Sequence, residues 1–201
     1  MLSSLFVLAL SFSVIGQNTS STFSIDIHGG LTASQVQGDG LSGFDKLGVI
    51  AGLGVSTSIN NNWDALLELN FLQKGSVKRP DAEIGDYTEY KMSLSYAQIP
   101  VMIKYHLSHK FNFSAGPAFG KLLSSKEQDR DGEIQSQIDF EEWEISAGLG
   151  AGYSFSERFA INVRLDSSLF PIRQKPAGNY NNLRGKQYNS SLILFISYSI
   201  N

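Results

Sequence analysis

The stretch WEISAGLGAGYSF, residues 143–155, decides the fold because it alternates along its whole length. One set of alternate positions holds Trp, Ile, Leu, Tyr and Phe with Ala, and the other set holds Glu, Ser and Gly. Successive side chains of a β-strand point to opposite faces of the sheet. A period of two therefore predicts a strand with one apolar face and one polar face.

The same period recurs along the chain and predicts seven further strands. The clearest runs cover residues 23–33, 47–56, 63–71, 111–119, 159–169 and 191–200, with one irregular run over 90–107. Tight turns are expected at Asn60–Asn62, Ser108–Lys110 and Ser156–Arg158, and long polar loops at 34–46, 75–88, 122–139 and 171–187. Short turns on one side and long loops on the other are typical of membrane barrels. The sequence thus predicts an all-β, eight-stranded antiparallel up-and-down transmembrane β-barrel.

The irregular run over 90–107 changes its parity near the middle. Its apolar residues occupy even positions before Ala97 and odd positions after it. A one-residue insertion moves every later side chain to the opposite face, and proline cannot donate to a sheet ladder. We therefore expect a β-bulge at Ala97–Pro100.

The polar face of the strands indicates which side meets lipid. A soluble eight-stranded barrel of the lipocalin type is the alternative, since it turns its apolar face inward around a ligand. Gly148, Gly150 and Gly152 favour a membrane barrel, because glycines weaken a solvated strand but fit a narrow lumen. Opposite charges on this face are expected to pair and to close the lumen, with an ion path as the alternative. The predicted interior network is Asp26, Glu68, Lys104, Glu142, Glu144, Arg164 and Asp166.

Aromatic residues gather on the apolar face near the strand ends. Such residues form belts at the two interfaces of a bilayer. The predicted lipid-facing aromatics are Trp63, Phe71, Tyr105, Phe111, Phe119, Trp143, Tyr153, Phe155, Phe159 and Tyr198.

The first residues are typical of an export signal. Residues 2–15 form an apolar run interrupted only by Ser and followed by Gly16. The run is too short for a membrane helix. No Lys or Arg precedes it, so a buried N-terminal element is the alternative. We predict a signal peptide over 1–16 and one barrel domain over 17–201.

The composition excludes several classes of function. The chain contains no Cys, which excludes disulfides, thiolate metal sites and cysteine nucleophiles. Charged residues make up 17% and the net charge is -3, so no nucleic-acid partner is expected. We also expect no cofactor and no metal site.

Several short motifs resemble one family of outer-membrane barrels. The run Leu67–Gly75 resembles the ELxFxQKG signature of the outer-membrane β-barrel (PorT-like) proteins of Bacteroidota. Ile99-Pro100 with Lys104-Tyr105 is similar to the IP…KY strand of that family, and Gly116-Pro117 also matches. The likeness covers most of residues 22–200, although the chain ends in Ile200-Asn201 where such barrels usually end in an aromatic residue. The resemblance implies a Gram-negative outer membrane and, for the founding member, a link to type IX secretion.

Two groups of residues are weighed for chemistry. Asp26 and His28 share a predicted inward face, as a base and its orienting carboxylate would, but no nucleophile accompanies them. Asp129, Asp131 and Glu133 resemble part of a calcium loop, without its full spacing. We expect a structural role for the first group and a solvated acidic loop for the second.

These observations predict a non-enzymatic barrel with both termini in the periplasm. It would be a scaffold or accessory subunit of a larger outer-membrane complex. Its expected partners are outer-membrane lipid and other outer-membrane or periplasmic proteins. The alternatives are a membrane-embedded enzyme acting on lipid or protein, and a narrow channel.

Overall fold

The protein is a closed barrel of eight long antiparallel strands in the part of the chain that the structure describes. The computed structural model describes residues 23–41, 43–80, 85–134, 139–174 and 185–200. The predicted signal peptide lies outside these residues. The strands are β1 (Phe23–Gln37), β2 (Lys46–Asn60), β3 (Trp63–Lys78), β4 (Tyr90–His106), β5 (Phe111–Asp129), β7 (Trp143–Ser154), β8 (Phe159–Ser168) and β9 (Tyr188–Ser199), with a two-residue strand β6 (Gly132–Glu133).

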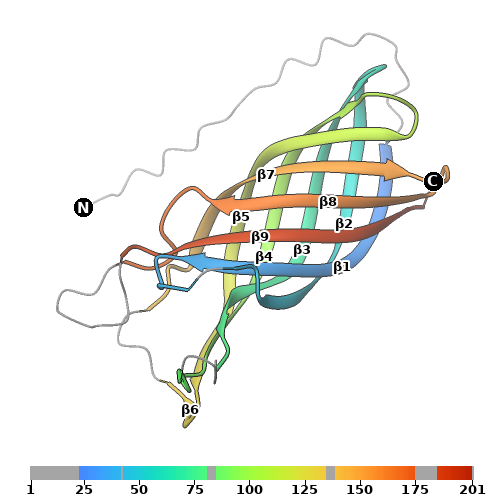
Figure 1. The fold of residues 1–201 in the computed structure, drawn as a ribbon. Helices are drawn as coiled ribbons and strands as arrows, with labels where there is room; N and C mark the ends of the chain where they lie inside the picture. Colours follow the sequence, from blue (N-terminus) through green and yellow to red (C-terminus); the bar gives the residue numbers. More distant parts are fainter. Residues whose placement is uncertain (1–22, 42, 81–84, 135–138, 175–184, 201) are drawn as a thin grey trace, which may run out of the picture.

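Each long strand pairs with the next one along the chain, and pairing of β1 with β9 closes the barrel (Figure 1). This seam runs from Asp26 opposite Ser199 to Gln37 opposite Tyr188. The short β6 pairs only with the end of β5. The predicted fold is therefore confirmed, and so are the three tight turns, which join β2 to β3, β4 to β5 and β7 to β8. No helix of the described residues is long and apolar enough to cross a membrane.

Three strands extend much further on the long-loop side than the sequence predicts. β3, β4 and β5 have 16, 17 and 19 residues, whereas β7, β8 and β9 have 12, 10 and 12. Figure 1 shows these three strands projecting beyond the rest of the barrel toward β6. We call this part, residues 73–78, 90–96 and 122–129, the projecting sheet. Residues 75–78 and 122–129 of the predicted loops are therefore strand.

The predicted bulge at Ala97–Pro100 is wrong. β4 keeps one register with β3 throughout, from Trp63 opposite Tyr105 to Lys78 opposite Tyr90. The irregularity falls between β4 and β5, where Ser95 faces Ser124 but Tyr96 faces Leu122, so the extra residue belongs to β5. The register between β3 and β4 is the same on both sides of Pro100. Between the Leu67–Val101 pair and the Asn70–Gln98 pair, two residues of each strand are not paired with the other strand.

The change of parity in β4 reflects a change in what the outward and inward faces of the strand contact. Even-numbered residues face the interior along the whole strand, and Met92, Leu94 and Tyr96 there are fully buried. On the outward face, exposed Ile99 and Val101 give way to Lys91, Ser93 and Ser95. An outward face that turns from apolar to polar, above an interior that turns apolar, is expected where a barrel leaves lipid and enters water. Ile193 and Phe195 of β9 are a different case, because they are buried inward while their outward neighbours Leu192, Leu194 and Ile196 remain apolar.

Candidate functional site: the barrel interior

The middle of the lumen is crossed by a two-pronged ion pair. Arg164 of β8 donates from both terminal nitrogens to the Glu68 carboxylate of β3, at 2.7 Å each. Asn70 donates to the same carboxylate at 2.9 Å, and its amide oxygen lies 2.7 Å from Nε2 of His28. The Arg164 guanidinium also lies over the ring of Phe195 at 5.2 Å. Bidentate geometry with further hydrogen bonds is what makes a buried ion pair tolerable.

A second charge cluster surrounds Lys74, which lies nearer to the long loops than the Glu68–Arg164 pair. Lys74 has no exposed surface, and its Nζ lies 3.0 Å from carboxylate oxygens of both Glu144 and Asp166. Ser146 and Gln98 donate to Asp166 at 3.0 and 3.2 Å. Because Lys74 comes from β3 and its two partners from β7 and β8, this cluster ties opposite walls of the barrel together.

Two further residues donate hydrogen bonds to the Glu144 carboxylate. Ser168 donates at 2.5 Å and Asn189 at 3.1 Å to its Oε1. Asn189 also donates to the hydroxyl of Tyr96 at 3.3 Å, and the Tyr96 ring lies 5.4 Å from the Lys74 ammonium. The cluster is therefore a connected polar network, which is the form that buried charges require.

The mouth on the long-loop side is closed by apolar residues and a third ion pair. Arg173 contacts both carboxylate oxygens of Glu127 at 3.0 and 2.7 Å, and lies over the ring of Phe140 at 4.2 Å. Tyr90 donates its hydroxyl to the same carboxylate. Burial, aided by Glu127, raises the pKa of Tyr90 well above its ordinary value. Beneath this pair lies the buried apolar core of Val36, Ile50, Leu72, Met92, Leu94, Tyr96, Phe140, Ile172, Ile193 and Phe195.

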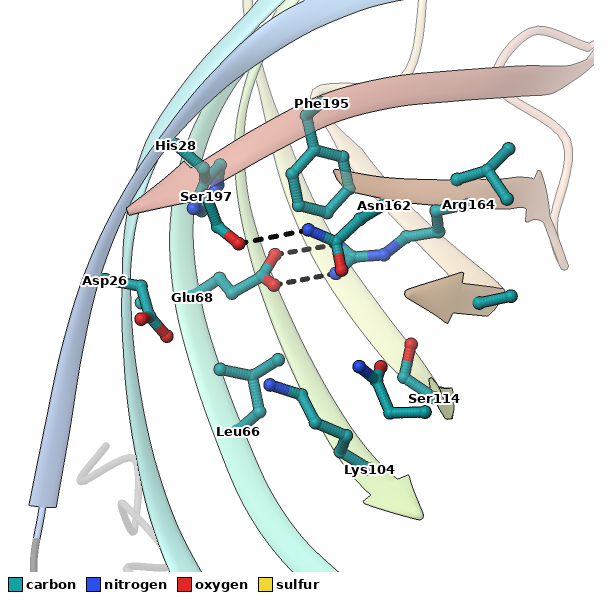
Figure 2. Close-up of a pocket in the computed structure, with 14 residues that line it drawn as sticks. Asp26, His28, Leu66, Glu68, Lys104, Ser114, Asn162, Arg164, Phe195 and Ser197 are labelled. Atoms are coloured by element: carbon teal, nitrogen blue, oxygen red, sulfur yellow. Dashed lines mark hydrogen bonds and ion pairs between the residues drawn. The ribbon is translucent and has the colours of Figure 1, made fainter. Parts of the chain in front are cut away.

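A small polar cavity remains toward the short turns (Figure 2). Its volume is about 30 Å³, and Asp26, His28, Glu68, Lys104 and Arg164 contribute to its wall. Figure 2 shows Asp26 and Lys104 on separate strands, to the left of and below the Glu68–Arg164 pair. A space of this size holds only a few water molecules.

Glycines make room for the interior side chains, as the sequence predicts. A Cβ atom on Gly150 would lie 2.7 Å from the Ser114 hydroxyl, and one on Gly152 would lie 2.6 Å from the Asn162 amide oxygen. A Cβ on Gly148 would touch the Arg164 side chain at 3.5 Å. The lumen is therefore packed to the backbone of β7 at these positions.

The structure brings together most, but not all, of the predicted network. Glu68 with Arg164 and Glu144 with Asp166 belong to buried clusters. Glu142 is a correction: it precedes the first residue of β7 and is exposed, so it does not line the lumen. Asp26 and Lys104 line the cavity half-buried, and neither makes an ion pair with a described residue.

Lys74, the most buried cation of the described residues, is absent from the predicted network. The predicted strand ends at Phe71, before Lys74, and both members of the Glu127–Arg173 pair lie in predicted loops. The alternation along β3 indicates the position of Lys74, because even-numbered residues such as Glu68 and Asn70 face inward and Lys74 is also even-numbered. Extending the predicted strand by three residues, from Phe71 to Lys74, places Lys74 in the lumen.

The residues weighed for chemistry take structural roles in the described part of the chain. His28 contacts Asn70, and no hydrogen bond joins it to Asp26 among these residues. Asp129 accepts from the backbone nitrogens of Asp131 and Gly132, at 2.8 and 3.2 Å, and so stabilises the turn between β5 and β6. The described residues contain no group of three or more metal-ligating side chains.

A family model described as "Outer membrane protein beta-barrel domain" matches residues 15–174. The chain belongs to this outer-membrane barrel family. The structure of Ail, the attachment invasion locus protein of Yersinia pestis, has a TM-score of 0.51 at 13% identity, with 88% of this chain and 98% of Ail covered. Ail in complex with the heparin analogue sucrose octasulfate gives 0.50 at 14% identity, covering 89% and 99%. No curated protein matches the chain.

All ten aromatic residues predicted to meet lipid lie on the outward face of this outer-membrane barrel, exposed or half-exposed. Near the short turns they form tilted pairs between neighbouring strands, Trp63 with Tyr105 at 4.7 Å and Phe111 with Tyr153 at 4.9 Å between ring centres. Toward the long loops, Trp143 is exposed and Lys121 lies over its ring at 5.6 Å. Their contact with lipid stays a prediction.

Proposed function

We propose that this protein is a non-enzymatic binding barrel, a scaffold or accessory subunit of a larger outer-membrane complex. The observation that carries the proposal is the projecting sheet. β5 pairs with β4 on one side and with β7 on the other, and it is seven residues longer than β7. Seven residues of strand measure about 23 Å. A stiff, polar sheet of this length is suited to contact other macromolecules beyond the bilayer.

The two alternatives have less support in the barrel interior. An enzyme needs a pocket that admits substrate, and the polar cavity near Asp26 and His28 measures about 30 Å³. A channel needs a continuous wet path, whereas Lys74 and Arg164 have 0% and 4% of their surface exposed. Charge pairs and the apolar core occupy successive levels of the lumen instead.

The finer assignments belong to the same proposal. We place the chain in the PorT-like branch of Bacteroidota because of the motif over Leu67–Gly75, and we expect secretion-linked partners on that ground. Both termini are placed in the periplasm, since the tight turns of outer-membrane barrels lie on that side. Residues 1–16 are proposed to be a signal peptide removed on export.

Planar-bilayer recordings are expected to detect no conductance steps for the intact barrel. Arg164 and Lys74 are each held by carboxylates at 3.0 Å or less, so the paired side chains block a continuous water path for dissolved ions. The conductance of the refolded variant Arg164→Ala/Lys74→Ala, which lacks both cations, is compared with that of the unmodified barrel. Regular steps from the unmodified protein would contradict a closed lumen and favour the channel.

A single introduced cysteine tests orientation and partners together. The chain has no natural Cys, so Gln128→Cys at the tip of the projecting sheet would be the sole site for a membrane-impermeant maleimide photo-cross-linker. We expect labelling on intact cells and, after irradiation, discrete protein adducts. The matched variant Glu157→Cys, in the tight turn between β7 and β8, should be labelled only after the outer membrane is opened.

Labelling of Glu157→Cys on intact cells would reverse the proposed orientation. Efficient labelling of Gln128→Cys without any adduct, in cells at native expression, would argue against a binding role for the projecting sheet.

A further inference from the structure

The outward face of the projecting sheet carries three lysines above the apolar band. Lys121 pairs with Ala97, Lys126 with Ser93, and Lys91 with Gln128 across the β4–β5 ladder. Cross-strand partners share a face, and the inward face is fixed by buried Leu94 and Tyr96, so all three lysines point outward. They are exposed.

No described residue neutralises these lysines. Lys91, Lys121 and Lys126 make no ion pair and no hydrogen bond with any described residue. Exposed acidic residues lie at both ends of the set without an ion pair to any of the three lysines. The backbone oxygen of Glu142 accepts from Leu122 beside Lys121, Glu89 lies two residues before Lys91, and Glu133 pairs with Gln128, the partner of Lys91.

Hydroxyl groups fill the space between the lysines. Ser93 and Ser95 of β4 and Ser124 of β5 lie on the same outward face, with Ser95 directly opposite Ser124. Serine hydroxyls donate and accept hydrogen bonds, and lysine ammonium groups bind phosphate as point charges. A surface that combines them suits a ligand with both sugar hydroxyls and phosphates.

The distance of the lysines above the apolar band distinguishes between two kinds of anionic lipid that they could bind. Lys121 lies beside the interfacial Trp143, at the edge of the apolar band. Along β4, the partners of Lys121 and Lys126 are four residues apart, and Lys91 lies two residues further. At about 3.3 Å per residue and a strand tilt of about 40°, Lys126 and Lys91 lie roughly 10 and 15 Å above Lys121. A phospholipid headgroup layer is only about 5–7 Å thick.

We propose that this outward face of the projecting sheet binds the phosphorylated saccharide headgroup of a glycolipid of the lipopolysaccharide type. Lys121 contacts the phosphates nearest the acyl chains, and Lys126 and Lys91 contact acidic groups further out along the saccharide. The serines bind the intervening sugars. The inference rests on the proposed orientation, which places the projecting sheet on the cell-surface side of the outer membrane.

The two tryptophans allow a direct binding measurement. In a Trp63→Phe background, Trp143 is the sole tryptophan and lies beside Lys121. Its emission is followed while refolded protein is titrated with lipopolysaccharide that has lipid A and inner-core sugars, and separately with phosphatidylglycerol, both in phosphatidylcholine vesicles. We expect Lys91→Gln/Lys126→Gln to weaken lipopolysaccharide binding about 25-fold, at about five-fold per lysine, and to leave phosphatidylglycerol binding unchanged.

Two further variants make the result specific. Lys121→Gln is expected to weaken binding of both lipids, whereas Lys110→Gln, the same change in the tight turn before β5, should weaken neither. Unchanged lipopolysaccharide affinity in the Lys91/Lys126 variant, or equal losses for both lipids, would overturn the proposal. Heat-modifiable migration verifies that each variant is folded. Because purified protein in vesicles has no fixed orientation, failure here is separate from failure of the labelling experiment on cells.

Discussion

Replacement of Lys74 with Met is expected to lower the free energy of unfolding by about 3–5 kcal/mol. The ammonium group is fully buried and holds the carboxylates of Glu144 and Asp166, each at 3.0 Å. Met fills a similar volume but leaves two buried carboxylates without a cation. Urea titration of refolded protein, followed by heat-modifiable migration, measures the loss.

The control for this variant is Lys104→Met, the same substitution at an inward lysine of β4. Lys104 is half-exposed in the polar cavity and has no ion pair among described residues, so we expect a change within about 0.5 kcal/mol. Adding Glu144→Gln to Lys74→Met removes one of the stranded charges and should recover part of the loss. Equal stability of Lys74→Met and the unmodified protein would mean that the network contributes little to folding.

The variant Gly30→Ala is expected to prevent normal closure of the barrel. Gly30 lies in the seam between β1 and β9, where a Cβ atom would stand 2.0 Å from the backbone oxygen of Leu194 and 2.5 Å from the Cα of Phe195. Backbone cannot move aside as a flexible side chain can, so the two strands must separate. We expect a loss of about 3 kcal/mol, the upper end of overpacking effects.

The neighbouring residue gives a matched control for the seam. Gly29→Ala adds the same methyl group on the same strand, but there the closest atom is the Ile50 oxygen at 3.8 Å, an ordinary contact. It should fold and migrate like the unmodified protein. If both variants are equally stable, the tight approach at Gly30 is not a constraint on closure.

Periodicity was sufficient to predict the barrel, its tight turns and the two faces of its strands. It failed in β4 because a change of parity has two physical causes. An inserted residue shifts the side chains, whereas a change from lipid to water reverses which face must be apolar. The seven residues from Tyr90 to Tyr96 show the second cause, and a single sequence does not distinguish them.

The site was predicted only where strand limits were right. Glu144 was correctly placed in the lumen, but Glu142 was not, since β7 begins between them at Trp143. Conversely, Lys74 was omitted because β3 continues past Phe71 to Lys78. The partners of Lys74 are 70 and 92 residues away in sequence, and their pairing depends on barrel closure.

The ion network also constrains how the barrel can be assembled. Lys74 arrives with the second strand pair, whereas Glu144 and Asp166 arrive only with β7 and β8. A half-inserted barrel would therefore hold a lysine without its carboxylates, and such a charge must stay hydrated until the remaining hairpins join. Stepwise, independent insertion of hairpins into bare lipid is unfavourable for this chain. Biogenesis is better served by concerted insertion, or by a catalyst that keeps the nascent lumen wet until the last strands are in place.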